Sequence, residues 1–227
     1  MIAHDGTSYV PASAFGRKYK AHRYAILFYG LLLTLVVLPI ATAIHLPTVL
    51  LKVLLGACLF AAVMPNSTRR NRWILLTAII LLLSARVASE AGDLPIRPAL
   101  VLALVGVTGI VAAAAALRFA VTSKVVNAEI VYAALSTYLL AGLFFGQIYW
   151  SIERIRAGSL VGPDPFSEQA AVYYSFVTLA TLGYGDFLPR TDVARGVATF
   201  EVIGGQLFLA VMVARLIGAF ERKKQDV

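Results

Sequence analysis

The residues of this chain with the clearest chemical potential form one short run, Thr181-Leu182-Gly183-Tyr184-Gly185-Asp186. Its two glycines, separated by one residue, can adopt positive φ without a Cβ penalty. A backbone whose residues alternate between positive and negative φ can point successive carbonyl oxygens at one axis. Stacked rings of carbonyl oxygens can replace the hydration shell of an ion that leaves water. The run could therefore bind ions, and one chain would supply only one wall of their path.

A short apolar stretch, residues 167–179, leads into this run. As a helix it would rise only about 20 Å, whereas a hydrocarbon core is about 30 Å thick. We therefore expect a re-entrant helix that enters the membrane from outside and stops midway. Irregular backbone at that depth is tolerated only where it lines a water-filled cavity or is buried in protein. Two helix starts are open, Asp164 followed by Pro165, or Ser167 as the N-cap.

The composition places these elements in a membrane. Hydrophobic residues make up 59% of the chain and charged residues only 14%, against about 25% charged in a typical soluble domain. We predict an all-α membrane protein with six spanning helices, the re-entrant helix lying between the fifth and sixth. The spans are expected within residues 24–44, 48–64, 73–85, 99–117, 130–151 and 196–219.

Most basic and most acidic residues fall on opposite sides of the membrane when both termini are placed in the cytoplasm. The segments then on the inner side hold basic clusters at residues 17–23, 69–72, 118–124 and 222–224, and the outer loops are acidic. The positive-inside rule therefore predicts a multi-pass protein of the plasma (cell inner) membrane with cytoplasmic N and C termini. We interpret the net charge of +8 as topology and contact with lipid head groups, and expect no nucleic-acid partner.

This topology divides the chain into five parts. They are a cytoplasmic amino-terminal tail (1–23), a four-helix domain (24–117), an intracellular linker (118–129), a pore domain (130–219) and a short cytoplasmic tail (220–227).

The stretch YYSFVTLATLGYGDFLPRTDVARG, residues 173–196, resembles the pore of the potassium-channel family, whose filter pattern is Thr-Val-Gly-Tyr-Gly-Asp. The resemblance implies a homotetramer, permeant K⁺ ions and no cofactor. It also implies K⁺ ligands from the carbonyls of Thr181, Leu182, Gly183 and Tyr184, with the Thr181 hydroxyl closing the innermost site and Gly185 completing the filter.

The resemblance further implies a support shell behind the filter, composed of Tyr173, Tyr174, Thr178, Ala180 and Asp186. We expect the two tyrosines to form an aromatic cuff, with Asp186 at the outer mouth able to accept a hydrogen bond. Interfacial aromatic side chains are the alternative for these tyrosines.

Three positions depart from the family pattern. Ala180 stands where a second Thr is common, Leu182 replaces Val, and Val177 stands where some members carry a Glu that pairs with the filter Asp. None of the three removes a backbone carbonyl, so potassium selectivity remains the expectation. A weakly selective cation channel stays open as the alternative.

The last predicted helix contains Gly204 and Gly205, which could form a gating hinge or allow close packing against the pore helix. Gln206 could face a water-filled cavity. Glu201 is an acid inside a span and is therefore a functional candidate, for which we expect a hydrogen bond to the neighbouring pore helix.

The first four helices do not resemble a working voltage sensor. Such a sensor needs several basic residues at three-residue intervals in its fourth helix, and residues 98–117 contain none. A six-helix transporter or an intramembrane enzyme are the alternatives outside channels. We expect no enzyme, because His4, His22 and His45 lie near no serine nucleophile motif. The sequence does not identify the gating stimulus or a regulatory partner.

Overall fold

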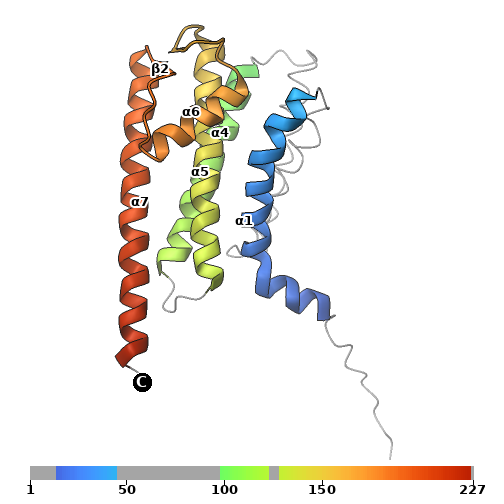
Figure 1. Ribbon diagram of the computed structural model, residues 1–227, viewed down its shortest axis with the longest axis vertical. Coiled ribbons are helices and arrows are strands. Elements are labelled where there is room, and N and C mark those ends of the chain that lie inside the picture. The colour runs from blue at the N-terminus through green and yellow to red at the C-terminus, as the bar shows by residue number, and fades with distance from the viewer. Residues whose placement is uncertain (1–13, 45–97, 123–127, 226–227) are drawn as a thin grey trace, which may run out of the picture.

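The computed structural model describes residues 14–44, 98–122 and 128–225, and these are almost entirely helical (Figure 1). The spans predicted at residues 48–64 and 73–85 lie outside the described residues. The elements are α1 (Ala14–Ala43), α4 (Pro98–Thr122), α5 (Ala128–Ile155), β1 (Leu160–Val161), α6 (Glu168–Leu179), β2 (Leu188–Pro189) and α7 (Asp192–Gln225).

Three described helices are long and apolar enough to cross a membrane, over Tyr24–Ala41, Ala128–Ile155 and Asp192–Gly218. A shorter apolar stretch, Ala99–Val111, lies in α4. The helical membrane fold is thus confirmed in outline, whereas the number of six spans remains a prediction.

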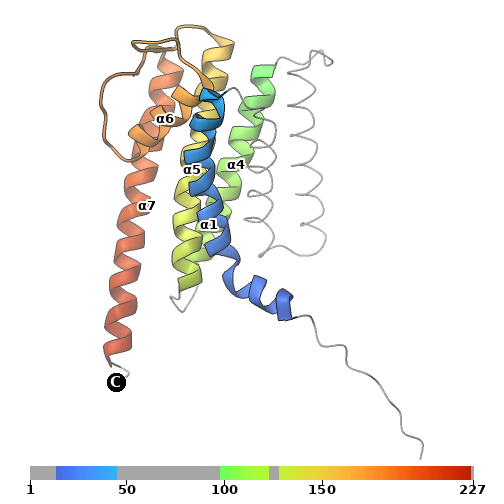
Figure 2. The same cartoon turned by 45° about the vertical axis from the view of Figure 1, so that its right-hand side comes forward.

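Helices α1, α4 and α7 extend beyond the predicted spans. Helix α1 begins at Ala14, within the predicted tail, α4 runs on to Thr122 within the predicted linker, and α7 continues to Gln225 through the second predicted tail. Hydropathy marks only the part of a helix that crosses hydrocarbon, whereas the helix itself can continue into water. The first part of α1 turns away from the bundle (Figures 1 and 2).

Helix α5 is the centre of the described fold and contacts α1, α4, α6 and α7. Small residues permit these close approaches. On α4, a Cβ at Gly109 would overlap the ring of Phe144 on α5. On the side of α5 that meets α6, a Cβ at Gly146 would lie 2.8 Å from the Cα of Val172.

The short helix α6 lies obliquely between α5 and α7, at the end of the bundle opposite the C-terminus (Figure 1). At the same end, β1 pairs antiparallel with β2, with Leu160 opposite Pro189 and Val161 opposite Leu188. The amide of Arg190 also donates to the Ser159 carbonyl over 2.8 Å. The segment after α5 is thereby joined to the chain that leaves the Thr181–Asp186 run.

Candidate ion-conduction site

Helix α6, the predicted pore helix, has Ser167 as its N-cap, which decides between the two starts left open by the sequence. Ser167 is the N-cap with extended backbone (φ −107°, ψ 172°), and its Oγ accepts from the Ala170 amide over 3.1 Å. Gln147 on α5 donates through Nε2 to the Glu168 carboxylate over 3.1 Å. The cap and this side-chain contact anchor the first turn of α6 beside α5.

At its other end, α6 passes directly into Thr181–Asp186, the predicted filter run. Ala180 is the C-cap, and the amide of Thr181 donates to the Thr178 carbonyl over 2.9 Å. The amides of Leu182 and Gly183 both donate to the Val177 carbonyl, over 2.9 and 3.4 Å. Carbonyls that a helix end leaves unpaired therefore hold the first amides of the filter run.

The sign of the backbone angle φ alternates along the filter run. Thr181, Gly183 and Gly185 have φ of +58°, +55° and +78°, while Leu182 and Tyr184 do not have positive φ. The two glycine values agree with what the sequence predicts. The value at Thr181 was missed, because a β-branched residue rarely adopts positive φ and no sequence signal marks it. Such strain persists only where surrounding structure imposes it, and here the amide contacts to α6 surround it.

The filter run is exposed in the single chain. Leu182 is 55% exposed and Tyr184 is 66% exposed. Among the described residues, nothing beyond their chain neighbours lies within 4 Å of the Cβ position of Gly183 or Gly185. One side of this backbone is therefore open in the described part of the chain.

The outer end of the run is held by Asp186 and its aromatic neighbours. The Phe187 amide donates to Asp186 Oδ1 over 3.0 Å. The Tyr173 hydroxyl lies within hydrogen-bonding reach of the Asp186 side chain. The Phe187 ring meets the rings of Phe166 and Tyr173 edge to face, at centroid distances of 5.4 and 6.4 Å. Phe166 and Phe187 were not identified from the sequence.

The two adjacent tyrosines of the predicted cuff occupy different places. Tyr173 is half-exposed and reaches Asp186, whereas Tyr174 is buried against α5. The Tyr174 ring stands edge to face with Tyr149 at 4.8 Å, and its hydroxyl interacts with the Thr178 side chain. Consecutive helical residues point about 100° apart, because an α-helix has 3.6 residues per turn.

Glu201 of α7 lies behind the pore helix and is fully buried (0% exposed). Its carboxyl oxygens contact the Tyr149 hydroxyl of α5 at 2.6 Å and the Ser175 hydroxyl of α6 at 2.5 Å. The contact with the pore helix expected from the sequence is therefore present. Tyr149 and Ser175 themselves were not identified in advance.

Gly205 packs against the end of the pore helix. A Cβ at Gly205 would lie 2.8 Å from both Cδ1 and the carbonyl oxygen of Leu179, whereas a Cβ at Gly204 would meet nothing within 4 Å. Helix α7 runs unbroken through both glycines. This geometry supports the close-packing role of Gly205 in the described conformation. Gln206 is exposed in the single chain.

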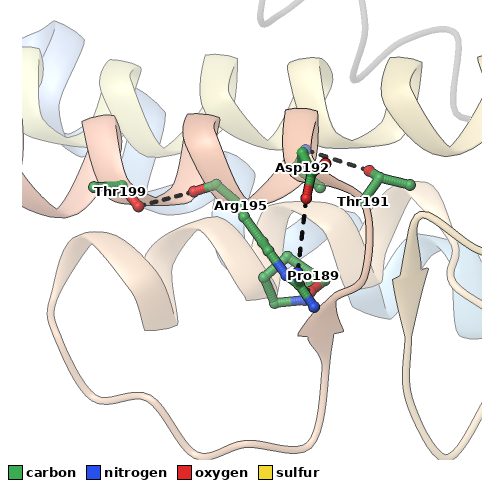
Figure 3. A network of polar contacts seen from close by, with 6 residues as sticks. Pro189, Thr191, Asp192, Arg195 and Thr199 are labelled. Atoms are coloured by element: carbon green, nitrogen blue, oxygen red, sulfur yellow. Dashed lines mark hydrogen bonds and ion pairs between the residues drawn. The ribbon is translucent and has the colours of Figure 1, made fainter.

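The start of α7 is tied to the strand that follows the filter (Figure 3). Arg195 donates through Nε to the Pro189 carbonyl of β2 over 3.2 Å. Thr191 Oγ1 accepts from the Ala194 amide over 3.4 Å, and the Thr199 hydroxyl donates to the Arg195 carbonyl over 2.9 Å. The chain that leaves the filter is thus held between β1 and α7.

Comparison with known proteins yields matches that cover this region. Residues 137–222, from within α5 to near the end of α7, match a family model described as ion channel. The chain is 40% identical over 61 residues to "Putative potassium channel protein RPA4233" of Rhodopseudomonas palustris, an alignment covering 26% of this chain and 15% of that protein.

Two further relatives are also potassium channel proteins by name. Identity is 31% over 94 residues with the inward rectifier potassium channel Kirbac3.1 of Paramagnetospirillum magnetotacticum, covering 40% of this chain and 29% of the relative. Identity is 31% over 78 residues with the human voltage-gated potassium channel regulatory subunit KCNG1, covering 34% of this chain and 15% of that protein. The chain thus spans less than a third of each relative's length. No solved structure matches.

Residues 137–222 thus resemble an ion-channel domain rather than an enzyme, and the described helices include three that are long and apolar enough to cross a membrane. The resemblance to the potassium-channel pore family is confirmed for the part of the chain that contains α6, the filter run and α7.

Proposed function

We propose that this chain is one subunit of a homotetrameric, potassium-selective channel. The observation that carries the proposal is the alternation of positive φ at Thr181, Gly183 and Gly185 directly after the pore helix. Four such strands around one axis can present rings of carbonyl oxygens from residues 181–184. These rings replace the hydration shell of K⁺ as it enters, and Thr181 adds its hydroxyl at the inner end.

The exposed surface of α7 supports assembly into a tetramer. Large apolar side chains at Phe200, Ile203, Leu207 and Val211 are each exposed in the single chain. Their spacing of three or four residues places them along one face of the helix. In a tetramer, the inner helices and pore helices of adjacent subunits would cover part of this surface, and lipid would cover the rest.

The pore helix supports cation passage through its electrostatics. The carboxy-terminal end of a helix carries partial negative charge, and α6 ends at Leu179 immediately before the filter. In the proposed tetramer, four such ends would face the inner cavity and favour a cation there. We place the filter at the outer face of the cell membrane and the basic end of α7, Arg222–Lys224, in the cytoplasm.

Reconstitution into lipid vesicles tests the proposal. We expect the reversal potential to follow the K⁺ gradient and to change little with the Na⁺ gradient. A reversal potential that follows both gradients would indicate the weakly selective cation channel. An absence of flux from protein that remains monomeric in native mass measurements would overturn the proposal, because one chain supplies only one wall of the filter.

A further inference from the structure

The buried carboxyl of Glu201 sits at the meeting point of three helices. Its Oε2 lies 2.6 Å from the Tyr149 hydroxyl, and its Oε1 lies 2.5 Å from Ser175 Oγ. Ser175 Oγ also lies 2.7 Å from the Gly142 carbonyl oxygen of α5. The result is a chain of three polar contacts, from Tyr149 through Glu201 and Ser175 to Gly142.

The hydrogens available to this chain of contacts can be counted. The Gly142 carbonyl can only accept, so its contact requires the single hydroxyl hydrogen of Ser175. Ser175 then has no hydrogen left for Glu201, and its Oγ can only accept there. Tyr149 supplies one hydrogen, to Oε2. An ionised carboxylate has none to offer, so a separate hydrogen for the contact between Glu201 Oε1 and Ser175 can come only from a proton on Glu201.

We propose that Glu201 is a protonated, uncharged carboxylic acid that donates from Oε1 to Ser175 and thereby positions the pore helix against the inner helix. All three contacts then have one hydrogen each. Because Glu201 is fully buried and acts through Ser175, it is a positioning residue.

The surroundings of Glu201 suit a neutral acid. The titratable groups that face it are the phenols of Tyr138 and Tyr149 on α5 and of Tyr174 on α6. No basic side chain acts on it among the described residues. A buried carboxylate without a cationic partner would bear a large desolvation cost, whereas a neutral acid with both oxygens bonded avoids it.

The contact between α6 and α7 continues from Glu201 towards the filter run. On α6, Ser175 and Leu179 are one helical turn apart, and on α7 their partners Glu201 and Gly205 are also one turn apart. Val177 lies between Ser175 and Leu179 on α6, and its carbonyl accepts from the amides of Leu182 and Gly183. Ionisation of Glu201 would remove its bond to Ser175 and place a charge behind the filter. If the proposed potassium conduction holds, flux should therefore fall as Glu201 loses its proton at alkaline pH.

Infrared spectroscopy of the reconstituted channel tests the protonation without reference to conduction. The matched variant is Glu201→Gln, whose amide can accept from Tyr149 and donate to Ser175 in the same places. We expect wild type at neutral pH to show a protonated-carboxyl C=O stretching band that shifts in D₂O and is missing from Glu201→Gln. Identical spectra in this region would overturn the assignment.

A second variant reports on the hydrogen-bond pattern. Tyr149→Phe removes the donor to Oε2 and leaves the Oε1 proton in place. The acid band should persist and move to higher frequency, because the C=O group loses its hydrogen bond. Loss of the band in Tyr149→Phe would contradict the proposed pattern.

The pH dependence of flux tests the positioning role. We expect wild-type K⁺ flux to fall at alkaline pH and the flux of Glu201→Gln to lack this fall, since an amide cannot ionise there. Coincident pH profiles would overturn the positioning role. An acid band in a protein that passes no K⁺ would instead sink the proposed function and leave the protonation standing.

Discussion

Gly205→Ala tests whether the inner helix supports the pore helix by direct contact. The new Cβ would lie 2.8 Å from the Leu179 carbonyl oxygen and from Leu179 Cδ1. The Cδ1 atom can rotate away, but the carbonyl belongs to the last turn of α6 and can move only with the backbone. The substitution should therefore displace the end of the pore helix.

The expected cost can be separated from the effect of alanine on the helix itself. Overpacking of this kind costs about 1–3 kcal/mol, and replacing a helical glycine with alanine returns up to about 1 kcal/mol. Gly204→Ala is the matched control, because it makes the same change one residue away and its Cβ meets nothing within 4 Å in the chain. The gain from replacing a helical glycine with alanine is the same in both variants. Gly205→Ala should therefore be less stable than Gly204→Ala by about 1–3 kcal/mol.

Titration with a denaturing detergent, followed by circular dichroism, measures this difference in unfolding free energy. Single-channel recording of the same variants should show that Gly205→Ala alters open probability more than the preference for K⁺ over Na⁺. Equal stability of the two variants would refute the contact-based reasoning. A change confined to selectivity would refute the expectation of altered open probability.

Two further predictions concern the filter and voltage. Gly183→Ala or Gly185→Ala should abolish selective K⁺ flux in vesicles, because alanine at φ of +55° or +78° costs roughly 1–2 kcal/mol. Gly158→Ala, with φ of +81° outside the filter, imposes similar strain and should still conduct; wild-type flux from either filter variant would contradict the mechanism. Open probability should vary only shallowly with voltage, because α4 carries a single basic residue, Arg118, and each charge moved contributes about 2.3 kcal/mol per 100 mV. A steep activation curve that persists when the permeant ion is changed would show that other charges cross the field.

The sequence by itself determined the features that depend on local chemistry. Glycines spaced by one residue predict positive φ at positions 183 and 185, because only the absence of Cβ makes that conformation inexpensive. A long apolar run predicts a spanning helix from its length alone. For the same reason, the pore helix could be predicted as too short to cross, and it ends at Leu179 as expected.

The sequence determined the helix ends less well. Hydropathy marks only the part of a helix that lies in hydrocarbon, and more than one nearby residue can serve as the N-cap. Asp164-Pro165 and Ser167 are both acceptable starts by local chemistry. The structure uses Ser167, where Glu168 in the first turn also accepts from Gln147 on α5. A contact with another helix therefore accompanies a choice that local preference leaves open.

Only the tertiary structure decided which residues meet across helices. Tyr149 and Ser175 lie 52 and 26 residues from Glu201 in the chain, and no spacing rule relates residues so far apart. The packing of Gly205 on Leu179 has the same origin. Each is set by how α5, α6 and α7 cross, and the crossing depends on the summed packing of many side chains that a local pattern does not encode.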